Sequence, residues 1–218
     1  MPSHKIHLAI AKKVNDKLNL DLDLFMLGNV LPDICRENHR LSHYQNPDKK
    51  VLCFADPDKF LSKHKNELNN PIMLGYLTHI LADRFYNEYI FKNFYVYDDN
   101  NNCIGIKYKG EFKELDADER KELKHKELET YDIWLLNNNY VSKFKDLDCY
   151  KKVKDFDDIT FSEDRLIKYI EDANKDIDDS HDEIYDYKLS TQEELNNIFN
   201  NCIKYILDYL SKNWRIIK

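Results

Sequence analysis

Residues Gly75–Tyr89 have the sequence GYLTHILADRFYNEY, and the rest of the chain can be understood as packing around them. Apolar residues in and beside this segment recur at helical spacing, at Leu74, Leu77, Ile80, Leu81 and Phe85. That pattern is typical of a mostly buried helix. His79 and Asp83 are four residues apart, so they lie on the same helical face, one turn from each other. Because a buried imidazole or carboxylate without a partner is costly, the pair needs a partner, and we expect a metal ion.

Helix start signals flank this segment on its N-terminal side. Asn70-Pro71 begins the central helix, which we expect to reach Phe94, and Asp56-Pro57 begins a shorter helix that runs to about Leu68. Further upstream, residues 6–18 carry an amphipathic stripe. A second short helix is predicted over Leu24–Val30, because Gly28 and Pro32 break helices. Asp33 is therefore expected just beyond a helix end.

The C-terminal half continues the helical pattern after one interruption. Residues 95–112 contain turn-forming Asp and Asn residues and a weak alternation, which predicts a surface loop or small hairpin near 97–112. Capping boxes at Asp116/Glu119 and Ser190/Glu193 predict the starts of two helices, and Ser162 begins another. The predicted fold is all-α, a single-domain bundle of six to eight helices over residues 1–218.

Composition agrees with a helical bundle. Four glycines and five prolines in 218 residues leave little room for a many-turned sandwich or barrel. Hydrophobic residues make up 42% of the chain, and the length suffices for a sizeable core. The net charge of −7 does not favour a nucleic-acid-binding surface.

Cysteine usage and hydropathy limit the compartment. The five cysteines are widely spaced and contain no Cys-x-x-Cys, so they form neither a disulfide framework nor a thiolate zinc site. The N-terminus lacks the apolar core of a signal peptide, and no apolar stretch approaches the ~20 residues of a membrane span. We therefore expect a reduced, cytoplasmic protein.

Further metal-ligating residue types lie in the first third of the chain, at His7, Asp33 and His43. Imidazole and carboxylate ligands suit Zn, Mn or Fe(II), and the lack of thiolates argues against a purely structural zinc. Each residue also has an ordinary interpretation when it is taken alone. His79 fits a core histidine held by a carboxylate, Asp33 a turn residue and His43 a surface loop residue.

The order of four motifs resembles a known family. The motifs are HLAIA at His7–Ala11, LGNVLPD at Leu27–Asp33, LSHY at Leu41–Tyr44 and LGYLTHILAD at Leu74–Asp83. Together they resemble the zinc-dependent phospholipase C family, which is similar to the single-strand-specific zinc nucleases. The resemblance covers about residues 5–90 well. It implies an all-helical fold that holds a cluster of up to three zinc ions.

The resemblance also implies a ligand set. One nearly complete metal site is implied at Asp33, His43, His79 and Asp83. In the family, the helix aspartate bridges to a further metal held by the first-helix histidine, here His7. A later His-x-x-x-Glu binds another zinc, and His125 with Glu129 has this spacing. On spacing alone, that last pair also fits an exposed i, i+4 pair on a charged helix.

Two departures from the family reduce the expected number of ions. The family's histidine shortly after His-x-x-x-Asp is missing, and Glu88 is the candidate replacement in that region. The family's N-terminal amino ligand has no clear counterpart, for which His4 is the candidate. We therefore expect one or two zinc ions rather than three. The other histidines, His39, His64 and His181, have polar sequence neighbours and are interpreted as solvated.

These residues predict metal-assisted hydrolysis of a phosphoric ester, either a small phosphoester or a phospholipid headgroup. Asp33 is the candidate catalytic residue, because a carboxylate beside the metal can orient or deprotonate the attacking water. Two alternatives stay open. A histidine–aspartate-type nucleotide phosphohydrolase would need an adjacent His-Asp pair, which occurs only at His181-Asp182. A catalytically silent helical module that binds metal is the other.

Overall fold

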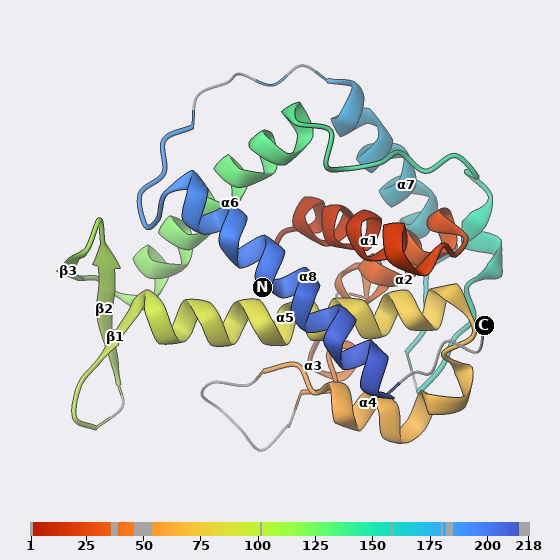
Figure 1. Cartoon of the computed structure of the whole chain (residues 1–218), viewed down its shortest axis with the longest axis horizontal. Coiled ribbons are helices and arrows are strands. Elements are labelled where there is room, and N and C mark those ends of the chain that lie inside the picture. Colours follow the sequence, from red (N-terminus) through yellow and green to blue (C-terminus); the bar gives the residue numbers. More distant parts are fainter. Residues whose placement is uncertain are drawn as a thin grey trace.

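The computed structural model describes residues 2–35, 39–45, 54–100, 102–157, 159–179, 181 and 185–213. This part of the chain is all-α, as predicted, with one small sheet (Figure 1). Its helices are α1 (His4–Leu18), α2 (Leu22–Ile34), α3 (His39–Ser42), α4 (Pro57–His64), α5 (Pro71–Asn93), α6 (Ala117–Asn137), α7 (Glu163–Asp178) and α8 (Gln192–Asn213). Short 3₁₀ turns follow α4 at Lys65–Glu67 and precede α7 at Cys149–Lys152. None of the described helices has an apolar stretch long enough to cross a bilayer.

Helices α2 and α5 form the centre of the bundle and touch backbone to backbone. A Cβ added at Gly28 of α2 would lie 2.0 Å from the carbonyl oxygen of Ile72, and one at Gly75 of α5 would lie 2.2 Å from that of Phe25. These separations are far shorter than any van der Waals contact, so only glycine fits at either position. The two glycines therefore set the close approach of the helices.

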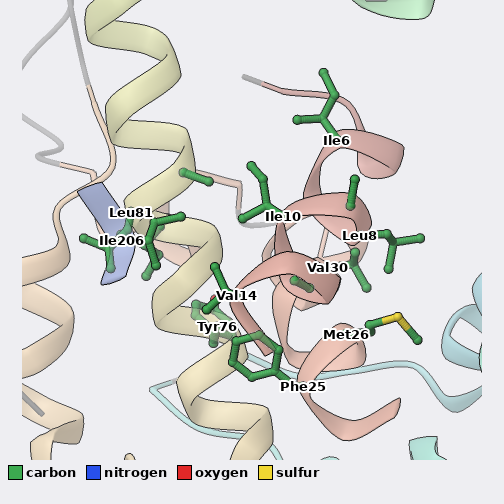
Figure 2. Packing of buried hydrophobic residues seen from close by; sticks show 14 of the residues in the cluster. Ile6, Leu8, Ile10, Val14, Phe25, Met26, Val30, Tyr76, Leu81 and Ile206 are labelled. Atoms are coloured by element: carbon green, nitrogen blue, oxygen red, sulfur yellow. The ribbon is translucent and has the colours of Figure 1, made fainter. Parts of the chain in front are cut away.

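The hydrophobic core surrounds this pair. Side chains of α1, α2, α5 and α8 meet in it (Figure 2). Fully buried members labelled in Figure 2 include Ile6, Ile10, Val14, Phe25, Val30, Tyr76, Leu81 and Ile206. Helix α5 is buried on nearly all its faces from Ile72 to Asp83, as expected for a helix at the middle of a bundle.

Helix α2 is longer than the sequence predicts. The prediction that Gly28 and Pro32 end it near Val30 was wrong, because the helix continues to Ile34 with Pro32 inside. Proline removes one helical hydrogen bond, here to the carbonyl of Gly28, and the ladder resumes where the Cys35 amide donates to the carbonyl oxygen of Leu31. The glycine serves the contact with α5 instead of breaking the helix. Asp33 consequently lies in the last turn of α2, not beyond its end.

The two predicted capping boxes have different outcomes. Asp116 and Glu119 form the predicted box at α6. At α8 the box is one residue later: Glu194 accepts from the Thr191 amide at 2.8 Å and donates its own amide to the Thr191 hydroxyl at 3.2 Å. Ser190 is unavailable as a cap because its amide donates to the buried carboxylate of Glu127 at 2.8 Å.

Glu127 links the middle of α6 to the segment before α8. Its side-chain oxygens accept the amides of Lys188 at 2.6 Å and Leu189 at 3.1 Å, in addition to the amide and hydroxyl of Ser190. Glu127 is 3% exposed. A buried carboxylate surrounded by backbone donors is fully satisfied, so this contact fixes how the last helix joins the bundle.

The predicted hairpin is a three-stranded antiparallel sheet. Its strands are β1 (Tyr95–Tyr97), β2 (Cys103–Tyr108) and β3 (Glu111–Glu114), in the order β1-β2-β3. Tyr95 pairs with Ile106, and Gly105 with Glu114. The sheet lies at one end of the molecule, next to the C-terminal end of α5 (Figure 1).

Candidate metal centre

Four elements bring a cluster of imidazoles and carboxylates together inside the bundle. Helix α1 supplies His7, α5 supplies His79 and Asp83, the last turn of α2 supplies Asp33, and His43 follows α3 directly. The ligand atoms of His7, His79 and Asp83 all lie within 4.8 Å of one another. His43 joins this group to Asp33, because its Nε2 lies 3.3 Å from Asp83 Oδ2 and 3.4 Å from Asp33 Oδ1.

The tautomers of His43 and His79 follow from their hydrogen bonds. Nδ1 of His79 donates to the carbonyl oxygen of Asn29 at 2.7 Å, and Nδ1 of His43 donates to that of His39 at 2.8 Å. Each Nε2 therefore presents a lone pair in the neutral ring. The two Nε2 atoms are 3.0 Å apart. Two lone pairs that face each other are favourable only when a cation or a proton lies between them.

Several other atoms of the cluster are buried without a hydrogen-bond partner. Both carboxylate oxygens of Asp83 and both ring nitrogens of His7 are in this state, although each residue is 0% exposed. A buried carboxylate with no donor is strongly destabilising. A divalent cation supplies the missing partner for these atoms, so the side chains fit a metal. Imidazole and carboxylate without thiolate are suitable ligands for zinc.

The charge states of the side chains in the cluster also suit metal binding. Burial lowers the pKa of His79 to about 3, with the charge of His7 acting in the same direction, so His79 is neutral at pH 7. Burial raises the pKa of Asp83, but the neighbouring imidazoles more than reverse this effect and hold the pKa below its ordinary value. The pKa of Asp33 is also well below its usual range, because His79 and His43 outweigh the effect of burial. Both carboxylates are therefore anionic at neutral pH.

The cluster opens to solvent at Asp33, whose side chain is 7% exposed. Two hollows, of about 890 Å³ and 260 Å³, meet at this residue and at His4. Nε2 of His4 lies 3.5 Å from Asp33 Oδ2. Asp33 thus has one oxygen toward the buried histidines and the other toward the opening.

The pair His125 and Glu129 lies at this opening and not in the buried cluster. Both side chains are exposed on α6 and line the larger hollow together with Asp33 and His39. Neither belongs to the groups of described residues whose ligand atoms converge within 4.8 Å. Glu88, the candidate for the missing ligand, instead forms an ion pair with Arg84 one turn earlier on α5.

None of the three histidines that were predicted to be solvated is exposed. The ring of His39 is half-buried and stacks on that of His43, with centroids 4.0 Å apart, and its ligand atom groups with those of Asp33 and His43. The His39-x-x-x-His43 spacing is the signal that could have identified it. His64 is 4% exposed, and Asp157 is 2.8 Å from its Nε2.

His181 is half-buried, and its Nε2 donates to the carbonyl oxygen of Asp176 at 2.8 Å. Its neighbour in the alternative His-Asp motif, Asp182, lies outside the described residues. Within the described part of the chain, His181 takes no part in a group of converging ligand atoms.

Asp132 supports the cluster from α6. It is 6% exposed and accepts a hydrogen bond from the Ser3 hydroxyl. The Ser3 oxygen in turn accepts the Ile6 amide at 3.2 Å and caps α1, the helix that carries His7. Burial raises the pKa of Asp132 to about 7.

The family described as zinc dependent phospholipase C matches residues 4–214, nearly the whole chain. No curated protein matches, and no solved structure does.

Proposed function

Because this chain belongs to the zinc-dependent phospholipase C family, we propose that it hydrolyses phosphoric esters with zinc bound in the buried cluster. The family supports a phospholipase C-like hydrolase and a phospholipid-type substrate. The span of the match supports a single domain over the whole chain. The proposed ligands of the buried zinc are His7, Asp33, His43, His79 and Asp83.

One observation carries the proposal. The Nε2 atoms of His43 and His79 face each other at 3.0 Å beside the carboxylate of Asp83. The oxygens of Asp83 lie 3.3 Å from His43 Nε2 and 3.4 Å from His7 Nε2 but accept no hydrogen bond. The Nδ1 hydrogen bonds that orient the two rings are the outer contacts usual for zinc-bound histidines. A cluster whose atoms satisfied one another by hydrogen bonds would not need an ion.

When bound, a divalent ion lowers the pKa of a water molecule and polarises a phosphoryl oxygen. Asp33 lies where it can accept the proton that the attacking water loses. Its Oδ1 faces His43, while its Oδ2 faces the opening and accepts the proton of the attacking water there. His4, 3.5 Å from Oδ2, can pass this proton to solvent.

We infer that His125 and Glu129 bind a second ion at the opening. Their exposure on α6 and their position in the larger hollow support a weaker, exchangeable site. One tightly held zinc and one labile zinc agree with the expectation of one or two ions.

The proposal is tested by elemental analysis of protein purified without chelator, followed by assays with nitrophenyl phosphate esters with and without choline, with phospholipid vesicles and with nucleotides. We expect at least one zinc per chain, turnover that EDTA abolishes and zinc restores, and a loss of about 100-fold or more in kcat for Asp33→Asn. Asp164→Asn, an exposed change in the first turn of α7, serves as the control.

Three results would contradict the proposal. Protein that retains zinc but has no activity on any ester would favour the catalytically silent module. Turnover of nucleotides alone would favour the nucleotide phosphohydrolase. Activity that survives Asp33→Asn and His79→Ala unchanged would come from a contaminant.

A further inference from the structure

The opening of the cluster is flanked by basic side chains from two helices. Lys121 and Lys124 of α6 line the larger hollow, and Arg165 and Lys168 of α7 line the smaller one. Each pair is three residues apart, which places both members on one face of their helix. The two hollows share Asp33 and His4, so the pairs lie on either side of the residue that leads to the buried cluster.

This concentration of positive charge contrasts with the whole chain, whose net charge is −7. Each hollow also has one carboxylate besides Asp33, namely Glu129 in the larger and Asp172 in the smaller. Four basic side chains therefore face two such carboxylates, and a bound zinc would offset the charge of Asp33. The opening is locally cationic in an acidic protein.

The larger hollow also lacks the groups that bind a quaternary ammonium. Cations of that kind are held over the faces of aromatic rings. Among the described residues that line this hollow there is no Phe, Tyr or Trp, and Tyr169 is the only such residue in the smaller one. The lining is therefore unsuited to a choline headgroup and suited to an anion.

We propose that this opening selects substrates that carry a second anionic group, a phosphate monoester, beside the ester that is cleaved. Lys121 and Lys124 bind this group, and Arg165 and Lys168 strengthen the field at the opening. This inference rests on the proposed function, and it names the class of substrate. A phosphorylated lipid headgroup and a soluble phosphorylated compound present the same chemistry.

The binding test uses the full-length, zinc-loaded chain and calorimetric titration with glycerol 3-phosphate and with glycerol 3-phosphocholine. The first carries a phosphate monoester, whereas in the second the phosphate is a diester that bears a quaternary ammonium. We expect glycerol 3-phosphate to bind more tightly, and the double change Lys121→Gln/Lys124→Gln to weaken it about tenfold or more, as the loss of charged hydrogen bonds predicts. Lys204→Gln, an exposed change on α8 outside both hollows, is the matched control.

The single change Lys121→Gln is the control for misfolding, because Lys121 is exposed and its replacement leaves the core unchanged. It should reproduce part of the loss and reduce the salt dependence of binding. Equal or tighter binding of glycerol 3-phosphocholine, or binding of glycerol 3-phosphate that neither lysine change alters, would overturn the inference.

A kinetic arm separates the two sources of the phosphate group. Vesicles containing phosphatidylinositol phosphate are compared with phosphatidylcholine vesicles and with a soluble phosphodiester that carries a second phosphate. Preference for either phosphorylated substrate, lost in the double lysine variant through KM more than kcat, supports the inference and identifies the source. If no ester is hydrolysed but lysine-dependent binding of glycerol 3-phosphate persists, the proposed hydrolase function fails while the anion site stands.

Discussion

Asp83 is a fully buried carboxylate that accepts no hydrogen bond. Its replacement separates a role in zinc binding from a role in the stability of the metal-free protein. We expect Asp83→Asn to raise the free energy of unfolding of the metal-free protein, because the change removes a buried charge that accepts no hydrogen bond. The same change should weaken zinc binding by more than the ~10–100-fold that loss of an outer contact costs. Competition with a zinc chelator and urea unfolding with and without EDTA measure both effects. Strong destabilisation of the metal-free form would mean that Asp83 serves as a partner of charged histidines instead.

Asp132 should make stability depend on pH. Its pKa is raised from 3.8 to about 7 by burial, so folding takes up a proton between these values. The free energy of unfolding should therefore fall as pH rises from about 4 to 7, by up to ~4 kcal/mol from this group. Asp132→Asn should remove that part of the slope. Urea unfolding of both proteins at several pH values gives the comparison, and parallel curves would contradict it.

Residue identities in the cluster were predictable from the sequence to different degrees. The motif order singles out His7, Asp33, His43 and the α5 pair, and the structure brings these residues together. The burial of His64 could not be predicted, because its partner Asp157 lies 93 positions away in a segment without a motif. Polar sequence neighbours describe a residue's local segment and say little about what folds over it.

At the scale of elements, the contact between α2 and α5 should tolerate no side chain. We expect Gly28→Ala to lower the free energy of unfolding by about 3 kcal/mol or more, because the added Cβ meets backbone that cannot rotate away. Gly110→Ala is the comparison: its φ is +84° and nothing lies within 4 Å. Strain alone should cost about 1–2 kcal/mol there. Thermal unfolding of the two variants checks the order, and equal losses would contradict the contact.

The hydrogen bonds by which Glu127 joins α6 to the segment before α8 can be tested by an isosteric change. Glu127→Gln replaces an oxygen acceptor by an NH₂ group that faces backbone donors. We expect a loss of about 2–3 kcal/mol and faster hydrogen exchange at residues 188–190. Glu122→Gln, an exposed change on the same helix, should have little effect. Unchanged hydrogen exchange at residues 188–190 would show that the Glu127 hydrogen bonds do not hold the segment in place.

Element boundaries followed the sequence where local signals were unopposed. The starts of α4, α5 and α6 lie where Asp56, Asn70 and Asp116 predict them. The exceptions have tertiary causes: Gly28 packs against α5 instead of ending α2, and Ser190 is bound by Glu127. Propensity gives way wherever a distant segment supplies the stronger contact.

For the whole molecule, metal binding should stabilise the bundle. The candidate ligands come from α1, α2, α5 and the residue after α3, so an ion joins segments that are far apart in sequence. With free zinc at 100 times its dissociation constant, the free energy of unfolding should rise by about 2.7 kcal/mol. Calorimetry with zinc and with EDTA measures this, and hydrogen exchange should slow in α1, α2 and α5 together. An unchanged melting temperature would argue against a buried ion.

The glycine contact between α2 and α5 has a consequence for ion preference. Since the peptide frames of the two helices already touch, they cannot move closer for a small cation, and moving apart would break their packing. Calcium, with bonds of about 2.3–2.6 Å and six to eight oxygen ligands, needs a roomier cage than zinc. A change in the metal preference of this protein must therefore come from side-chain length, such as aspartate to glutamate, while the spacing of the two helices stays the same.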